Sequence, residues 1–198
     1  MATKKSEEIS IKPLNLQTVE IRILGVTELI THKWSDKAKK MMLDKQMGKS
    51  VEKRPKKDPE EDYESSIYRL PDGSIGFPSA GFKAAIVGAC RMFDGLPMTL
   101  AKQVIRVNGE FVKIEGEPRM REDMVRLETG VADIRYRAGF PEWRTTLSIT
   151  FNANIITPEM LINLVDAAGF GGVGEWRPSS PKSATGSFGC FRVALEGE

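Results

Sequence analysis

The chain has 198 residues, 40% hydrophobic and 28% charged, with 29 basic and 27 acidic side chains and a formal net charge of +2. A single domain of this length buries roughly 70% of the surface of its unfolded chain, so neither a metal nor a disulfide is needed for folding. Two distant cysteines, no apolar signal region and no apolar run near the roughly 20 residues that cross a bilayer exclude a membrane span and predict a cytoplasmic protein.

Charge is distributed in blocks near the N-terminal third of the chain. Basic residues dominate from Lys33 to Lys57, and acidic residues dominate from Asp58 to Glu64. Such blocks are typical of solvated surface, although the basic half is also a candidate arm for binding a nucleic-acid strand. We expect an insertion at about 33–68, preceded by a flexible N-terminus at 1–17.

The first half of the chain contains one clear strand and two helices. Alternation from Thr18 to Val26 predicts a strand with one buried face. Ser35 is the expected N-cap of a short helix that ends at Gly48, and Pro78-Ser79 opens a longer one. An apolar stripe is predicted on that longer helix at Phe82, Ala85, Ile86, Ala89 and Phe93.

The second half begins with a turn signal. Asn108-Gly109 predicts a type I′ hairpin within Val104 to Ile114. Trp143 to Ala153 is the clearest strand, with an inward face formed by Thr145, Leu147, Ile149 and Phe151. Thr157-Pro158 begins a second long helix, for which Gly169 is the expected C′ residue, and a last strand follows near Phe188 to Leu195.

In order, these elements predict an α+β fold with a ferredoxin-like (RRM-type) β-α-β-β-α-β core, inserted hairpins and a basic insertion. We expect one domain over 18–198, with a hairpin protrusion at about 119–143.

The most informative stretch is the glycine-dense segment between the second long helix and the last strand. Gly169 to Gly174 fits G-x-G-x-x-G, but a dinucleotide site needs a strand before it and a helix after it, and here that order is inverted. One interpretation is a helix C-cap followed by a flexible loop. The other is a functional loop in which glycines allow close approach of a ligand beside Trp176, Arg177 and Lys182.

Arginines and aromatic residues alternate in the region of the expected protrusion. The arginines are Arg119, Arg121, Arg126, Arg135, Arg137 and Arg144, and the aromatic residues are Tyr136, Phe140 and Trp143. This pattern favours phosphate neutralisation and base stacking. The alternative is a solvated hairpin whose arginines pair with Glu122, Asp123, Glu128 and Asp133.

His32, the only histidine, is a candidate general base, although a lone histidine is more often structural. No Cys/His cluster or spaced carboxylates indicate a metal site, and no Walker loop or G-x-S-x-G elbow occurs. We therefore expect no metal and no cofactor.

Three segments together resemble the RAMP superfamily, and more narrowly the backbone subunits of CRISPR effector complexes. They are Thr31-His32-Lys33-Trp34, the helix start Pro78-Ser79-Ala80-Gly81-Phe82-Lys83, and the glycine-rich loop from Gly169 to Gly189. In that family a Pro-Ser-Ser-x-Lys-Gly-like helix start and the glycine-rich loop lie close to RNA. By position, the resemblance relates the region from Val125 to Trp143 to the thumb hairpin that grips the next copy.

These features predict a non-enzymatic protein that binds single-stranded nucleic acid, with RNA favoured over DNA, and assembles as successive copies, with other effector subunits as further partners. The expected binding residues are Lys33, Trp34, Ser79, Lys83, Arg135, Tyr136, Arg137, Gly171, Gly172, Gly174, Trp176, Arg177 and Lys182. One alternative is a metal-independent RNA endonuclease that uses His32. Another is a phage-type assembly or inhibitor protein, with Trp34, Trp143 and Trp176 as interface anchors.

Overall fold

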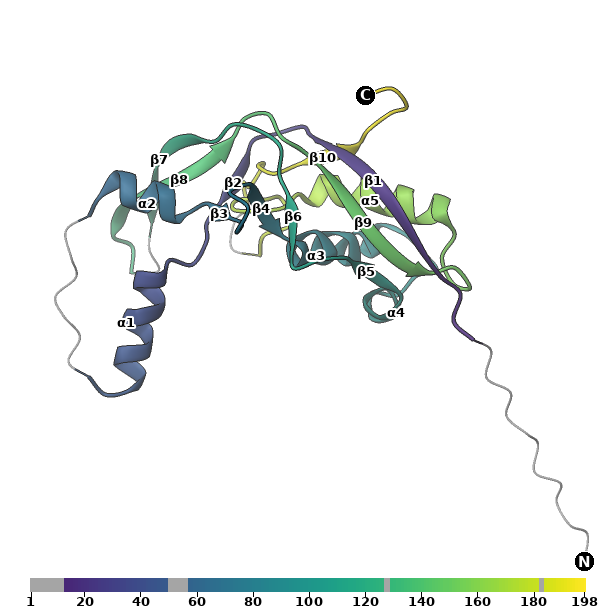
Figure 1. The fold of residues 1–198 in the computed structure, drawn as a ribbon, viewed down its shortest axis with the longest axis horizontal. Helices are drawn as coiled ribbons and strands as arrows, with labels where there is room; N and C mark the ends of the chain where they lie inside the picture. Colours follow the sequence, from purple (N-terminus) through teal and green to yellow (C-terminus); the bar gives the residue numbers. More distant parts are fainter. Residues whose placement is uncertain (1–12, 50–56, 127–128, 182–183) are drawn as a thin grey trace, which may run out of the picture.

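The computed structural model describes residues 13–49, 57–126, 129–181 and 184–198 and confirms a mixed α+β chain (Figure 1). Its elements in chain order are β1 (Leu16–Gly25), β2 (Leu29–Thr31), α1 (Asp36–Gln46), α2 (Pro59–Ser65), β3 (Tyr68–Arg69), β4 (Ile75–Pro78), α3 (Ser79–Ala89), a 3-10 turn (Cys90–Met92), α4 (Met98–Val104), β5 (Ile105–Val107), β6 (Phe111–Lys113), β7 (Arg119–Arg126), β8 (Ala132–Phe140), β9 (Arg144–Asn152), α5 (Pro158–Gly171) and β10 (Phe191–Val193).

The largest sheet has the strand order β10-β1-β9-β5, and every neighbouring pair in it is antiparallel. One face carries buried residues, such as Ile21 and Ile23 of β1 and Leu147 of β9, while Glu20 and Arg22, which alternate with the buried residues of β1, are exposed. The helices α3 and α5 belong to the same apolar core as the buried face. The predicted inward set of β9 is confirmed, since Thr145, Leu147, Ile149 and Phe151 are all buried.

Both long helices form where the sequence predicts them, but each ends at a different residue from the one predicted. In α3, Phe82, Ile86 and Ala89 are buried as expected. Phe93 was wrongly assigned to this stripe, because the helix gives way to the 3-10 turn and Phe93 is extended and exposed. Thr157 caps α5 as predicted, accepting a hydrogen bond from the Met160 N–H at 3.2 Å.

The predicted end of α5 at Gly169 is wrong, because the helix continues to Gly171 and is capped by Gly172. Gly169 has a packing role instead. A Cβ at that position would collide with the Phe191 backbone, so the missing side chain lets α5 approach β10 closely.

Two smaller sheets, β2-β8-β7 and β3-β4-β6, are also antiparallel. The hairpin predicted at Asn108-Gly109 does not form. Gly109 does have φ +80°, but β5 pairs with β9 while β6 pairs with β4, so the turn carries the chain from one sheet to another.

The helices α1 and α2 follow β2 and precede β3 along the chain, and α1 stands away from the rest of the molecule in Figure 1. Ser35 caps α1 as predicted, accepting from the Ala38 N–H at 3.2 Å, yet no residue of α1 is buried. At the N-terminus, residues 1–12 of the expected flexible segment lie outside the described residues, whereas Leu16 and Gln17 already belong to β1. Over the described ranges, no helix has the length and apolar character to cross a bilayer.

Candidate nucleic-acid interface

Two clefts meet at His32, which lines both of them. The first, of about 520 Å³, lies between Gly81, Ala84 and Gly88 of α3, Ala168 of α5 and the segment after α5, and is called the α3 groove. The second, of about 490 Å³, lies between α1, α2 and β8 and is called the β8 cleft. Its basic lining among the described residues is Lys33, Lys37, Lys57, Arg135 and Arg137, against Asp62 and Asp133.

Backbone hydrogen bonds hold His32 beside β8. Thr31, the last residue of β2, pairs with Ala138, and the Lys33 N–H donates to the Ser66 carbonyl at 3.1 Å. The Ser66 hydroxyl in turn accepts from the Ala138 N–H at 2.8 Å. The chain therefore leaves β2 along β8 and carries His32, Lys33 and Trp34 into the β8 cleft.

Arg137 is a buried charge with weak compensation. Its side chain is 4% exposed, and its Nε and Nη1 atoms have no hydrogen-bond partner among the described residues. The nearest carboxylate, Glu175, lies 3.9 Å from Nη2, and the guanidinium stacks over the Trp176 ring at 5.1 Å. Burial lowers the pKa of Arg137, while Glu175 opposes that effect. A buried, weakly paired cation of this kind favours the approach of an anion.

His32 shares the Glu175 carboxylate with Arg137. The distance from Nδ1 of His32 to Oε1 of Glu175 is 4.0 Å. Burial lowers the pKa of His32 and the positive charge of Arg137 lowers it further, whereas Glu175 acts in the opposite direction. Because the pKa lies below the ordinary value of about 6.5, His32 is predominantly neutral at pH 7.

The glycine-rich segment packs closely against the rest of the protein. Gly174 has φ +81°, and a Cβ there would lie 2.5 Å from the carbonyl oxygen of Ile30. The next residue, Glu175, donates its N–H to the same carbonyl at 3.0 Å. Trp176 then has φ +51°, the one positive value outside glycine in the described chain. This tight attachment to β2 places Glu175 and Trp176 beside His32 and Arg137.

Many of the predicted binding residues come together in these clefts. Lys33, Trp34, Arg135, Tyr136 and Arg137 line the β8 cleft, and Gly171, Gly174 and Arg177 line the α3 groove. Trp176 contacts Arg137 directly, whereas Gly172 is buried, with φ +63°, as the cap of α5.

Two other predicted residues do not line the clefts, and a third cannot be placed. The Ser79 hydroxyl donates to the Gly109 carbonyl at 2.6 Å, so this side chain holds the start of α3 against the turn before β6. Lys83 is half-buried on α3 and lines neither cleft. Lys182 lies outside the described residues.

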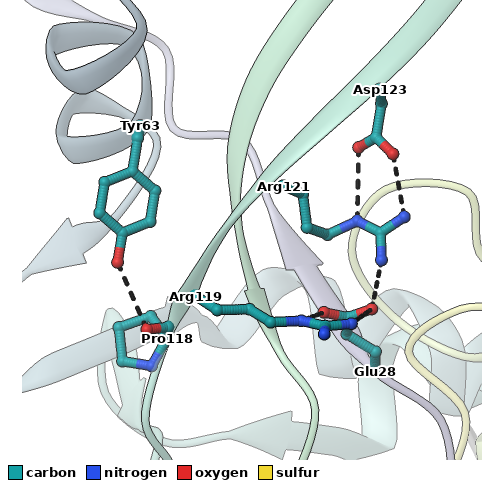
Figure 2. Close-up of polar contacts among 6 residues, drawn as sticks. All are labelled: Glu28, Tyr63, Pro118, Arg119, Arg121 and Asp123. Carbon is teal, nitrogen blue, oxygen red and sulfur yellow. Dashed lines mark hydrogen bonds and ion pairs between the residues drawn. The ribbon is translucent and has the colours of Figure 1, made fainter.

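The hairpin of β7 and β8 contains an ion-pair network at its base (Figure 2). Arg119 donates to Glu28 at 2.9 Å, and Arg121 binds both Asp123, at 2.9 Å, and Glu28. Burial alone would raise the pKa of Glu28, but its hydrogen bond from Arg119 and the charge of Arg121 outweigh burial and lower it. Nearby, Tyr63 donates to the Pro118 carbonyl at 3.4 Å.

These contacts separate the arginines of the protrusion into two groups. Arg119 and Arg121 form ion pairs within the protein, as does Arg144 with Glu115 at 2.8 Å. Arg135 and Arg137 line the β8 cleft and form longer ion pairs, Arg135 with Asp133 at 3.6 Å and Arg137 with Glu175 at 3.9 Å. The sequence alone did not indicate Glu28 or Glu175 as site residues. Glu28 lies more than 90 positions along the chain from Arg119 and Arg121, and Glu175 lies about 40 positions from Arg137.

The tryptophans differ in their surroundings. Trp143 is buried and its Nε1–H donates to the Thr27 carbonyl at 2.9 Å, so it belongs to the core. Trp34 is 51% exposed. Among the described residues no group of three or more His, Cys, Asp and Glu side chains is arranged to hold a metal ion.

Comparisons with known proteins find similar structures but no matching sequence family. No protein-family model matches the sequence, and a search of curated proteins finds no significant match. The structure is similar to a chain of type III-B Cmr-beta bound to cognate target RNA, with a TM-score of 0.56 and 11% identity over 91% of this chain and 59% of that chain. Cmr6 from Pyrococcus furiosus aligns with a TM-score of 0.45 and 10% identity over 92% of this chain and 100% of that one.

The chain thus spans 59% of the length of the Cmr-beta chain that it matches. At these identities the likeness concerns the fold. At that level it confirms the predicted resemblance to subunits of CRISPR effector complexes.

Proposed function

We propose that this protein binds single-stranded RNA without cleaving it, with the sugar-phosphate backbone of the RNA in the β8 cleft. The observation that carries the proposal is Arg137, which is 4% exposed and lacks hydrogen-bond partners for two of its three nitrogens among the described residues. Keeping such a cation buried is costly unless an anion completes its environment. A phosphate at the mouth of the β8 cleft supplies that anion.

The rest of the β8 cleft suits a single strand. Lys33 and Arg135 add positive charge, and Trp34 and Tyr136 offer aromatic surfaces to unstacked bases. Aromatic stacking tolerates any base, so binding to this cleft alone is largely independent of sequence. The similarity in fold to a chain from an RNA-bound complex is consistent with RNA rather than DNA as the ligand.

A titration of labelled RNA and DNA oligonucleotides at low and moderate salt tests this proposal. We expect RNA binding at low salt that weakens as the salt concentration rises, because bound phosphates release counterions. Absence of binding at low salt would contradict the proposal.

We also propose that residues 18–198 form one domain built on a ferredoxin-like core, which consists of β1, α3, β5, β9, α5 and β10. The antiparallel strand order β10-β1-β9-β5 supports this assignment. The helices α1 and α2 are then an insertion after the first strand, and β7 and β8 form a protruding hairpin.

Assembly as successive copies along the strand, with other effector subunits as further partners, is part of the same proposal. Exposed apolar side chains on the hairpin of β7 and β8 support it: Met124 is 65% exposed and Ile134 is 44% exposed. Sedimentation with RNA of increasing length tests it, since the mass of the complex should rise stepwise with the length of the strand.

A second function, metal-independent RNA cleavage, is favoured by one observation. His32 lies in a cleft 4.0 Å from Glu175 and close enough to Arg137 for that charge to lower its pKa, an arrangement typical of acid-base sites. Incubation of labelled RNA in EDTA decides between the two functions. Cleavage that His32→Ala abolishes would establish the nuclease, whereas intact RNA under binding conditions excludes it.

A further inference from the structure

The α3 groove is kept open at one position by a glycine that internal packing does not require. Gly88 lies inside α3 and lines the groove, and a Cβ placed on it meets no described atom within 4 Å. Gly81 on the same helix differs, because its Cβ would lie 2.6 Å from the Phe77 ring. Glycine inside a helix is less favourable than alanine. What Gly88 provides is an unobstructed groove.

Glu175 is the one carboxylate among the described residues that line the groove, where Arg91 and Arg177 are the positively charged side chains. Arg177 donates to the Gly174 carbonyl at 2.9 Å. Glu175 contributes a half-exposed carboxylate whose two ion pairs, at 4.0 Å to His32 and 3.9 Å to Arg137, are both longer than hydrogen bonds. Its oxygens therefore retain capacity to accept hydrogen bonds from a ligand. The neighbouring walls are apolar, with Tyr68, Phe77 and Met98 among them.

The groove also has the size and position for one base of a bound strand. Its volume of about 520 Å³ falls within the range of roughly 300–1,000 Å³ typical of small-molecule sites. Because it meets the β8 cleft at His32, a strand whose phosphates face Arg137 can turn a base into the groove beside Glu175.

We infer that the α3 groove binds an unstacked guanine base of the strand, an inference that rests on the proposed RNA-binding function. Guanine presents two adjacent donors, N1–H and the N2 amino group, on its Watson-Crick edge, and these match the two oxygens of the Glu175 carboxylate. As hydrogen-bond donors on that edge, adenine and cytosine present only an amino group, and uracil presents only N3–H. Proteins commonly read unstacked bases of single-stranded RNA by this edge.

Fluorescence anisotropy with labelled RNA of about ten nucleotides tests the inference. The oligonucleotides contain only uridine, or uridine with one central guanosine, adenosine or cytidine. We expect the guanosine oligonucleotide to bind about tenfold more tightly than the all-uridine one, the effect of one good bidentate pair. In Glu175→Gln the preference disappears, while binding of the uridine oligonucleotide becomes tighter because a negative charge is removed.

A second pair of variants separates the groove from the fold. Gly88→Leu fills the groove, so the ratio of the dissociation constants of the all-uridine and the guanosine-containing oligonucleotides falls to about one. Because leucine is also the better helix former, the melting temperature does not fall. Ala80→Leu adds the same side chain to an exposed position of α3 outside the groove and keeps the tenfold ratio.

Equal binding of all four oligonucleotides by the unaltered protein, or a ratio that survives Gly88→Leu, overturns the guanine site and leaves RNA binding intact. Failure of every oligonucleotide to bind at low salt overturns the proposed function, and the guanine site with it.

Discussion

At the scale of single residues, Arg137 combines a cost to folding with the role in RNA binding that we propose for it. Its charge is buried and weakly paired, so an uncharged side chain of similar length should suit the free protein at least as well. Trp176 and Glu175 hold the guanidinium in the lining of the β8 cleft, a placement that suits the binding of an anion.

We therefore expect Arg137→Met to maintain or raise the melting temperature while weakening RNA binding about tenfold or more, since hydrogen bonds to charged groups contribute about 1.5–3 kcal/mol. Calorimetry and anisotropy measure the two effects. Arg106→Met is the control, because Arg106 is an exposed arginine of β5 outside both clefts. A lower melting temperature with unchanged binding would show that Arg137 is structural.

His32 should make stability depend on pH. Its pKa is lower in the folded protein than in the unfolded chain, so the unfolded state binds more protons between the two values. The contribution of neutral His32 is complete above about pH 6.5 and is lost as the pH falls through the lower, folded pKa. We expect urea unfolding between about pH 5 and pH 8 to show a smaller dependence on pH in His32→Gln. An identical dependence in the two proteins would refute this.

At the scale of elements, the β7 and β8 hairpin is tied to the core through Glu28. The carboxylate is largely buried, with an exposed fraction of 10%, and receives both Arg119 and Arg121. Arg121 also lies over the Phe188 ring at 4.9 Å, so the network links the hairpin to the segment before β10.

Removing the Glu28 carboxylate should destabilise this connection. We expect Glu28→Ala to lower the free energy of unfolding by about 2 kcal/mol, because it removes the charge-assisted hydrogen bonds that a largely buried carboxylate accepts from Arg119 and Arg121, although Arg121 keeps its pair with Asp123. In the control Glu115→Ala, the lost pair with Arg144 is more than half exposed on both sides, and the change should stay within about 0.5 kcal/mol. Chemical denaturation measures both, and equal losses would argue against the Glu28 network as an anchor.

The elements of the main sheet and its helices could be predicted because their signals are local. Alternation in β9 and the cap at Thr157 each depend on a few neighbouring residues. The hairpin at Asn108-Gly109 failed because a turn sequence fixes a backbone conformation but not the partner of each strand. There the longer β9 pairs with β5, and β6 pairs with β4.

At the scale of the whole molecule, the candidate site depends on contacts between distant segments. The sequence indicated Arg135, Arg137 and Trp176 through residue type alone. It could not indicate Glu175 as the common neighbour of His32 and Arg137, because those contacts require the tight attachment of Gly174 and Glu175 to β2. Neither could it show that Ser79 is engaged by the Gly109 carbonyl.

The uneven distribution of basic residues predicts the salt dependence of binding. Each phosphate contact on a single strand contributes about −0.7 to the slope of log K against log salt concentration. Arg135→Ala should make the slope less negative by about that amount. Lys102→Ala removes an exposed charge of α4 outside both clefts and should leave the slope unchanged. Titrations at several salt concentrations give the slopes, and equal reductions in both variants would point to diffuse attraction by net charge.

The stacking of Arg137 on Trp176 gives the molecule a spectroscopic signal of its own. The indole lies 5.1 Å from the guanidinium carbon, whereas Trp143 is held in the core. Any ligand that draws the cation away from the ring alters the emission of that tryptophan. Intrinsic fluorescence, with a Trp34→Phe background to remove the exposed indole, can therefore follow occupation of the β8 cleft without an attached dye.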